Sequence, residues 1–183
     1  MRRLLLLVIV SGLGLLPALA PAALIPWSAT LSGLQEVPPN ASPATGSASG
    51  TFDTDTHVLT WTVSVSGLTS PATAGHIHGA AAPGVIAPVL VTFNLGALLG
   101  NTSGSFSGSA DLDGDPALAA IFDDIPVAER IGQFMDDLWY VNIHTQQLPG
   151  GEVRGQISQV PEPASVALMG LALVVLALAR RRG

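Results

Sequence analysis

Apolar and small polar residues alternate along much of the chain between residues 27 and 157. In the segment 57–68, HVLTWTVSVSGL, every second residue from Leu59 to Val65 is apolar, and the residues between them are Thr or Ser. Successive side chains of a β-strand point to opposite faces, so this pattern predicts a strand with one core face and one polar face. Similar alternation predicts strands in 27–34, 44–52, 89–95 and 103–112.

Turn-forming residues separate these segments, in the clusters VPPNASP, DTDT, SPATAG, AAAPG, GNTSG and LPGG. Seven or eight short strands at this spacing predict an all-β fold, an antiparallel Greek-key β-sandwich or barrel. The segment 115–138 instead has helical spacing, with Asp115 placed to cap a helix that begins at Pro116. We therefore expect one or two short helices inserted before the last pair of strands.

A final β-hairpin is predicted over residues 138–158, around the turn LPGG. Alternation assigns four apolar residues to the core, namely Val141, Ile143, Val153 and Ile157. It assigns four polar residues to the opposite, outward face, namely Asn142, His144, Glu152 and Arg154. Cross-strand partners share a face, so this register allows His144 to lie opposite Glu152. The same register places Asn142 opposite Arg154.

The chain begins with the features of a secretory signal peptide, expected over residues 1–23. A basic start, Met1-Arg2-Arg3, precedes an apolar run, and PALAPAA then offers small residues for cleavage. Pro21 disfavours a cut directly after Ala20, so we expect cleavage after Ala22 or Ala23. An uncleaved membrane anchor is the alternative interpretation. Either way, the domain that follows, over residues 24–159, is expected to be exported.

The last segment, residues 160–183, has three parts. Pro161, Glu162 and Pro163 precede an uncharged run over 164–179, and the basic cluster Arg180, Arg181 and Arg182 follows it. The uncharged run predicts a short transmembrane helix, rising about 24 Å against the ~30 Å of a usual hydrocarbon core. Basic residues flank membrane helices on the cytoplasmic side, so the preceding domain is expected on the opposite side of the inner membrane.

This tail resembles the PEP-CTERM sorting signal of Gram-negative bacteria. The resemblance implies recognition by an exosortase, removal of the tail, and release to the periplasm, outer surface or extracellular matrix. A plain C-terminal anchor is the alternative.

Charge and composition exclude several classes of function. Between the terminal segments the chain has twelve acidic residues, two arginines and no lysine, which gives a net charge near −10. Nucleic-acid binding requires clustered basic residues and is therefore excluded. The chain has no cysteine, which excludes disulfides, zinc thiolate sites and cysteine nucleophiles. No serine lies in a nucleophile elbow and no glycine loop forms a phosphate cradle, so we do not expect an enzyme.

The central domain resembles the CHRD domain, a module named after chordin and also found in bacterial secreted proteins. The matching segments are LSGLQEVPP (31–39), ATGSASGTF (44–52), HIHGAAAPGVIAPV (76–89) and YVNIHTQQLPGGEVRGQI (140–157). The resemblance implies a secreted β-rich domain. The growth factor that chordin binds is not carried over to a bacterial chain. We expect a structural or binding module of the cell surface or exopolysaccharide matrix.

The segment GHIHG (75–79) contains the candidate metal ligands. If Ile77 faces the core, His76 and His78 share the other face, with Cα atoms about 6.5 Å apart. His144 also faces outward and could complete a copper or zinc site, with Glu152 as fourth ligand or orienting partner. The HIH strand resembles that of copper/zinc superoxide dismutases, which suggests redox chemistry as an alternative function. Purely structural hydrogen bonding of the histidines is the simpler interpretation.

An acidic turn, DLDGDP, offers Asp111, Asp113 and Asp115 as calcium ligands. An EF-hand loop beginning at Asp111 would require glycine where Pro116 stands and glutamate where Phe122 stands. A solvated turn that caps a helix is therefore favoured over a calcium site. His57 is interpreted as a surface turn residue. A calcium-stiffened adhesive domain remains a third hypothesis, based on the acidic surface alone.

Overall fold

The computed structural model describes residues 24–113 and 125–160, together with Gly170 and Arg180. The predicted signal peptide, the predicted helix start at Asp115 and most of the predicted transmembrane helix lie outside these residues. Within the described part of the chain, no helix combines the length and apolar character needed to span a membrane.

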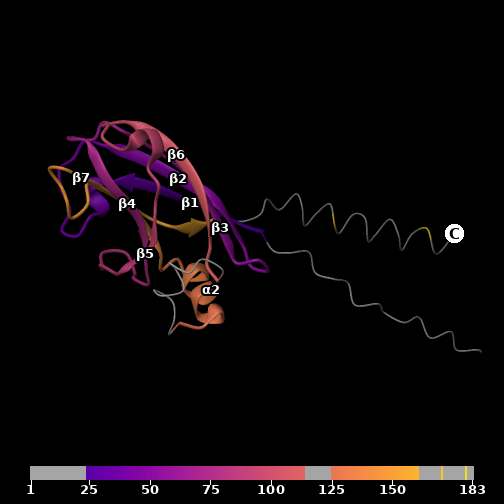
Figure 1. Ribbon diagram of the computed structural model, residues 1–183. Coiled ribbons are helices and arrows are strands. Elements are labelled where there is room, and N and C mark those ends of the chain that lie inside the picture. Colours follow the sequence, from indigo (N-terminus) through magenta and orange to yellow (C-terminus); the bar gives the residue numbers. More distant parts are fainter. Residues whose placement is uncertain (1–23, 114–124, 161–169, 171–179, 181–183) are drawn as a thin grey trace, which may run out of the picture.

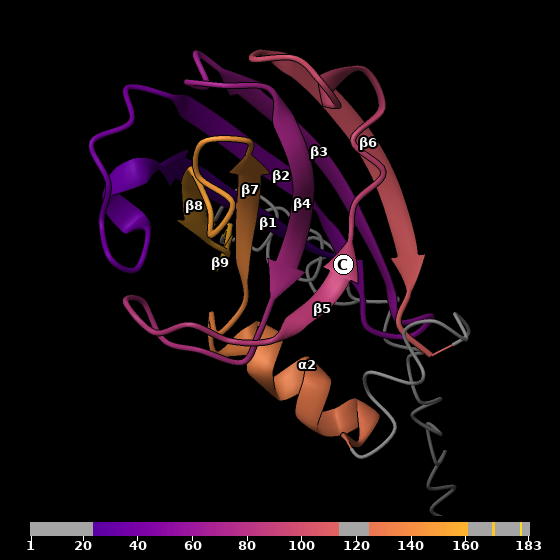
Figure 2. The ribbon, with the colours of Figure 1, turned by 60° about the vertical axis from the view of Figure 1, so that its left-hand side comes forward.

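Nine antiparallel strands form one sheet in the order β5-β4-β7-β8-β1-β2-β3-β6, with β9 paired to β1. The sheet curls into a nearly closed barrel (Figures 1 and 2), which confirms the all-β prediction and selects a barrel-like form. The strands are β1 Leu24–Ser32, β2 Thr45–Asp53, β3 Val58–Ser66, β4 Ala72–His78, β5 Val89–Thr92, β6 Gly104–Asp111, β7 Tyr140–Thr145, β8 Val153–Gln156 and β9 Ser158–Gln159. The helical elements are the 3₁₀ turns η1 Gly33–Gln35 and η2 Gly96–Leu98, and the helix α2 Val127–Met135.

The barrel interior contains the residues that alternation assigned to the core. Buried side chains from β1, β3, β4, β7 and β8 form one hydrophobic cluster. Burial of this apolar surface is the main force that holds the sheet in its curled form. The core predictions for Leu59, Val63, Ile77, Val141, Ile143, Val153 and Ile157 are confirmed, and Trp27, Leu31 and Phe52 of the other predicted strands are buried too.

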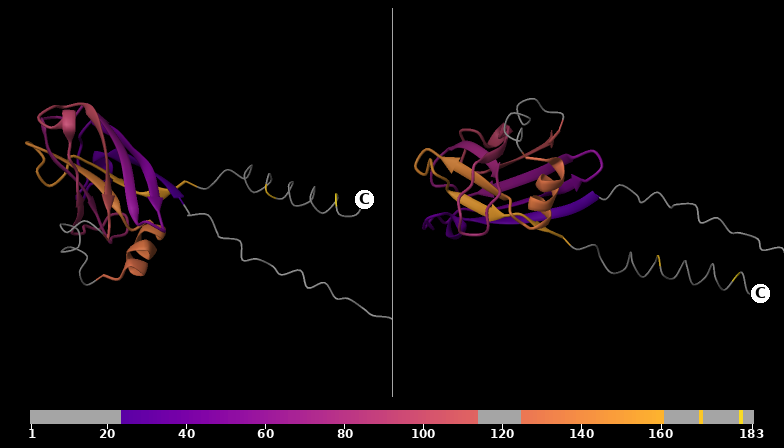
Figure 3. Two further views of the ribbon diagram at one scale, coloured as in Figure 1. Left: turned by 45° about the vertical axis from the view of Figure 1, so that its right-hand side comes forward. Right: turned by 90° about the horizontal axis from the view of Figure 1, so that it is seen from below.

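Helix α2 lies across one end of the barrel (Figures 2 and 3). Its Phe134 is buried and packs against Phe52 of β2, with ring centroids 4.9 Å apart. Trp139, just before β7, packs edge to face against the Phe134 ring, with ring centroids 5.5 Å apart. Three aromatic rings therefore close this end, so the predicted inserted helix has a packing role.

The two glycines of GHIHG are packing positions. A Cβ atom on Gly75 would lie 2.8 Å from a methyl carbon of Leu95 and 2.9 Å from one of Ile143. A Cβ atom on Gly79 would lie 2.5 Å from the Trp139 ring. All three distances are shorter than carbon atoms tolerate, so glycine lets the core pack closely around β4.

Strand β4 lies between β5 and β7, and this arrangement positions the candidate site. His76 of β4 lies opposite Asn142 of β7, which in turn lies opposite Arg154 of β8. The predicted pairing of Asn142 with Arg154 is therefore confirmed. His144 lies opposite Ala74, one diagonal position from His76. Diagonal neighbours across antiparallel strands lie within reach of long side chains.

The sequence pattern predicted that the outer face of β7 and β8 points to solvent, but the structure buries three of its polar residues. Asn142, Glu152 and Arg154 are all buried. The β1–β2 loop, residues 33–44, crosses this face: Asn40 donates to the Glu152 carbonyl at 3.1 Å, and Asn142 donates to a Glu36 carboxylate oxygen at 3.4 Å. Alternation identifies the two faces of a strand but gives no information about a loop that folds over one of them.

Candidate metal centre

Three histidines converge on the outer face of β4 and β7. His76, His78 and His144 each offer one ring nitrogen, and these nitrogens all lie within 4.8 Å of one another. In one pair, His76 Nδ1 and His144 Nε2 are 3.0 Å apart. Two nitrogens on one tetrahedral metal ion lie about 3.3 Å apart, given metal–nitrogen bonds of about 2.0–2.1 Å. The three nitrogens therefore lie close enough together to be candidate ligands of one ion.

Backbone carbonyls fix the protonation pattern of two of these rings. His144 Nδ1 lies 3.0 Å from the carbonyl oxygen of Pro149, and His78 Nδ1 lies 3.0 Å from that of Ala87. A carbonyl only accepts hydrogen bonds, so both Nδ1 atoms carry the hydrogen. In each neutral ring the Nε2 atom then has a free lone pair. Metal-binding histidines in proteins are oriented in this way by hydrogen bonds to their second nitrogen.

The Nε2 atom of His78 is buried and has no hydrogen-bond partner among the described residues. The whole His78 residue is only 9% exposed. Leaving a buried acceptor unsatisfied costs on the order of 1–3 kcal/mol. The lone pair of the other oriented ring, on His144 Nε2, accepts the Nδ1 hydrogen of His76 at 3.0 Å. For His76 to bind an ion through Nδ1, its hydrogen would have to move to its Nε2 atom, and an ion held by all three rings would also satisfy His78.

All three imidazoles are held in the neutral form that binds metal. Burial, followed by the neighbouring charges of His144 and His78, lowers the pKa of His76 to about 4. Burial also lowers the pKa of His78 and of His144, although their hydrogen bonds to Ala87 and Pro149 oppose that shift. Protonated histidine cannot ligate a metal. At neutral pH, therefore, no proton has to be displaced from a charged ring before binding.

These shifts predict that the metal-free protein loses stability as the pH falls from about 6.5 towards 4. In the unfolded chain the three histidines titrate near the ordinary pKa of about 6.5, whereas in the fold their pKa is lowered, for His76 to about 4. These three side chains therefore bind more protons in the unfolded state in this window, and through them acid favours unfolding. Thermal unfolding at a series of pH values measures the slope. Replacing all three with glutamine should flatten it, and equal slopes would contradict the prediction.

An aromatic stack supports His78 from the side. The rings of His78 and Tyr140 are parallel within 4°, with centroids 4.9 Å apart. The guanidinium carbon of Arg154 lies 3.4 Å from the centroid of the Tyr140 ring. The Tyr140 hydroxyl accepts the N–H of Ala87 at 3.0 Å, so Tyr140 also positions the carbonyl that orients His78. The stack restricts rotation of the His78 ring.

The structure places the Glu152 carboxylate in a different network. One of its oxygens accepts hydrogen bonds from the Ser42 hydroxyl and the Thr69 N–H, each at 2.7 Å. The other oxygen accepts a hydrogen bond from the Thr145 hydroxyl at 2.7 Å. Glu152 is not part of the histidine cluster that the described residues form. Its contacts tie the β1–β2 loop and the β3–β4 connection to the last hairpin.

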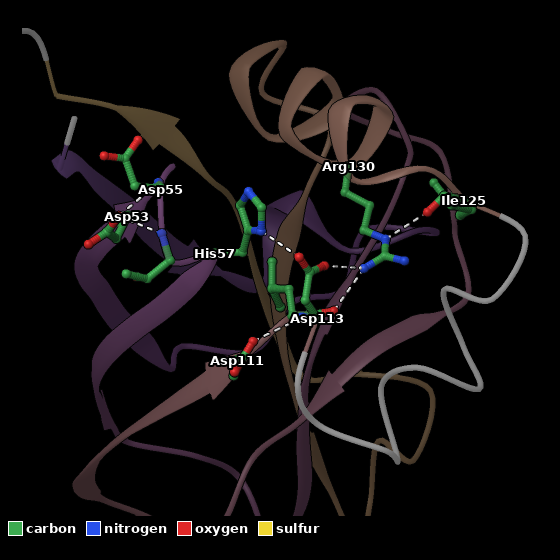
Figure 4. Close-up of polar contacts among 9 residues, drawn as sticks. Asp53, Asp55, His57, Asp111, Asp113, Ile125 and Arg130 are labelled. Atoms are coloured by element: carbon green, nitrogen blue, oxygen red, sulfur yellow. Dashed lines mark hydrogen bonds and ion pairs between the residues drawn. The ribbon is translucent and has the colours of Figure 1, made fainter. Parts of the chain in front are cut away.

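The acidic turn and His57 form a separate cluster where β6 ends and β3 begins (Figure 4). His57 Nδ1 lies 2.5 Å from an Asp113 oxygen, and Arg130 of α2 donates to the other Asp113 oxygen at 3.0 Å. The Asp111 side chain accepts the N–H of Asp113 at 3.0 Å. His57 directly follows the turn at residues 54–56 and also pairs with Asp113, and the cluster docks α2 onto the barrel. Asp115 lies outside the described residues.

Comparison with protein families identifies the fold that carries this site. A family model of the CHRD domain matches residues 27–157. The chain belongs to the CHRD family. The PEP-CTERM protein-sorting motif matches residues 159–182, which implies an exported protein that exosortase sorts towards the envelope or surface of a Gram-negative cell. No curated protein and no solved structure matches the chain.

The CHRD segments recognised in the sequence supply the whole histidine site and its supports. The segment 76–89 provides two histidines and the Ala87 carbonyl, and the segment 140–157 provides His144, Tyr140 and the Pro149 carbonyl. Sequence reasoning did not assign roles to Tyr140 or to the two carbonyls. A carbonyl leaves no signal in the sequence because every residue has one. Tyr140 shares the outward parity of His144 and could have been found by that rule.

Proposed function

We propose that the chain is an exported, non-enzymatic CHRD protein of the cell surface or matrix, and that its domain binds copper or zinc through His76, His78 and His144. The observation that carries this proposal is the buried, unpartnered Nε2 atom of His78 beside two other imidazoles. A binding role for the domain also agrees with its place in a chain that carries an export and sorting motif. We expect an exopolysaccharide matrix to surround the exported domain.

The donor set favours copper or zinc over other divalent ions. Imidazole nitrogen suits copper and zinc, whereas calcium and magnesium prefer oxygen ligands. Among the described residues the cluster contains only nitrogen donors, since the Glu152 carboxylate is engaged elsewhere. Three protein ligands leave a coordination position for water or another small ligand.

Metal analysis of the protein tests this proposal. Protein purified after expression of the full chain would be exposed to micromolar copper or zinc, dialysed, and measured by inductively coupled plasma mass spectrometry. We expect about one equivalent of one of these metals to remain per chain. Loss of all copper and zinc on dialysis would overturn the proposal. Calcium retained in their place would instead support the calcium-stiffened adhesive domain.

A redox function is the second candidate, favoured by the open coordination position of a three-histidine site. Copper bound in this way could exchange electrons with a small oxyanion such as superoxide. A superoxide-consumption assay on the copper-loaded protein tests this candidate. A rate no higher than that of the zinc-loaded protein would exclude it and leave metal binding as the function.

Deleting residues 161–183 should change where the protein accumulates. The deletion removes Pro161, Glu162 and Pro163 together with the arginines of the sorting motif, so exosortase has no substrate. We expect the truncated protein to be exported without processing at the envelope and to fractionate differently. Immunoblots of cell fractions and culture medium measure both size and location. Identical fractionation and processing of the two proteins would contradict sorting through this tail.

A further inference from the structure

A pocket of about 430 Å³ lies on the same outer face as the histidines. One wall is the segment Leu34 to Pro39 of the β1–β2 loop, the other is Pro83 and Gly84 of the β4–β5 loop, and Arg154 and Gln156 of β8 lie between them. This volume is within the range of about 300–1,000 Å³ that small-molecule sites occupy. The pocket is therefore larger than an inorganic ion requires.

Arg154 is a buried cation with few partners. It is 2% exposed, its guanidinium lies over the Tyr140 ring, and within the described residues its one hydrogen bond is a 3.5 Å contact with the Gln156 side chain. Within the described residues, the ion pairs join Asp113 to His57 and Arg130, so no carboxylate lies within 4.0 Å of Arg154. A guanidinium has five N–H donors and stays charged. A buried charge without a hydrogen-bonded counterion is costly, and an anion would relieve that cost.

The free donors of Arg154 are accessible from the pocket. No nitrogen atom of Arg154 is both completely buried and without a hydrogen bond. The nitrogens without a hydrogen bond therefore retain some contact with open space, and Arg154 lines this pocket. The amides of the two glutamines are already used: Gln35 donates to Thr30, and Gln156 donates to Ala81 and Asp137. Arg154 is thus the donor left for a ligand.

Much of the remaining pocket wall is apolar. Leu34 is 78% exposed at its mouth, and Val37, Pro39 and Pro83 also line it. The one acidic wall residue is Glu36, and burial raises its pKa to about 7 although Arg154 and Asn142 lower it. A weakly acidic Glu36 repels an anion less than an ordinary carboxylate would. The pocket therefore combines one guanidinium with an apolar wall.

We propose that this pocket binds an organic carboxylate, whose carboxylate group pairs with Arg154 and whose carbon skeleton lies against Leu34, Val37 and Pro83. Planar guanidinium groups bind carboxylates through two parallel hydrogen bonds, which gives both strength and orientation. The carbon skeleton would be a sugar ring, as in an acidic polysaccharide residue, or an aromatic ring. This site is distinct from the histidine cluster and does not depend on bound metal.

Calorimetric titration with four probes tests the proposal. Sodium galacturonate and sodium benzoate represent the acidic sugar and the aromatic acid, and galactose and benzyl alcohol are their neutral counterparts. We expect one acid to bind at least about tenfold more tightly than its neutral counterpart, and the acid that binds identifies the skeleton. Equal binding of an acid and its neutral counterpart would overturn the proposal, as would the absence of binding by both acids.

Two variants locate the binding at this pocket. Leu34→Glu adds a negative charge at the mouth of the pocket on a largely exposed residue, so the fold should tolerate it. We expect it to weaken binding of the acid about tenfold or more. Leu99→Glu is the matched control, because Leu99 is 59% exposed and lies outside the pocket. Unchanged binding in Leu34→Glu, or equal weakening in both variants, would overturn the assignment.

Discussion

Replacing His78 with alanine should weaken copper or zinc binding by at least about 100-fold. Changes to residues that only orient a metal ligand typically cost 10–100-fold in affinity, and loss of a ligand costs more. Among the described histidines, His78 supplies the nitrogen that is buried and without a partner, on a ring oriented by the Ala87 carbonyl. Competition with a chromophoric chelator measures the affinity of the wild-type and variant proteins.

The fourth histidine provides a matched control for this experiment. His57 lies in the separate cluster with Asp113, and its backbone has a φ angle of 55°. Asparagine tolerates this left-handed conformation, so His57→Asn removes an imidazole with little backbone strain. We expect His57→Asn to bind metal like the wild type. Equal affinity of His78→Ala and the wild type would contradict the site.

Replacing Glu152 with alanine should lower the free energy of unfolding by about 3–5 kcal/mol. The residue is 0% exposed. Its carboxylate accepts three hydrogen bonds of 2.7 Å, from Ser42, Thr69 and Thr145. Each buried donor left without a partner costs on the order of 1–3 kcal/mol, partly relieved where water enters. Urea unfolding followed by circular dichroism measures the change.

Two further variants separate the structural role of Glu152 from a role in metal binding. Glu129→Ala alters an exposed glutamate of α2 and should change stability by less than about 0.5 kcal/mol. Glu152→Gln keeps the shape of the side chain and should leave metal affinity unchanged. A large loss of metal affinity in Glu152→Gln would show that Glu152 serves the site after all. Wild-type stability of Glu152→Ala would contradict its role in joining the loops.

The strands and their faces were predictable because alternation is a local property. Leu59, Val63 and Ile77 are buried as their parity requires. The order of strands in the sheet was not predictable in the same way. The pairing of β4 with β7 joins residues more than 60 positions apart, and it depends on how the whole barrel closes. The sequence therefore indicated that His144 faces outward without showing that it lies beside His76.

For the candidate site, the sequence could predict which face of its own strand each side chain occupies, but not the contacts that a distant loop adds. His76, His78 and His144 have the parity expected of them and meet because their strands are neighbours. Glu152 shared that parity, but the β1–β2 loop brings Ser42 to its carboxylate. Such a contact between residues 110 positions apart has no periodic signal in the sequence. The burial of Arg154 escaped prediction for the same reason.

If the proposed metal binds, the pairing of β4 with β7 would give it a further role in a chain that has a sorting motif and no cysteine. His76 and His144 are 68 residues apart in the sequence. An ion bound to both would cross-link the chain across a loop of that length. In the loop-entropy treatment, a cross-link of this span lowers the entropy of the unfolded chain and so raises the free energy of unfolding by about 4 kcal/mol. Metal would thus act as a reversible counterpart of a disulfide, present where the surroundings supply the ion and absent where they do not.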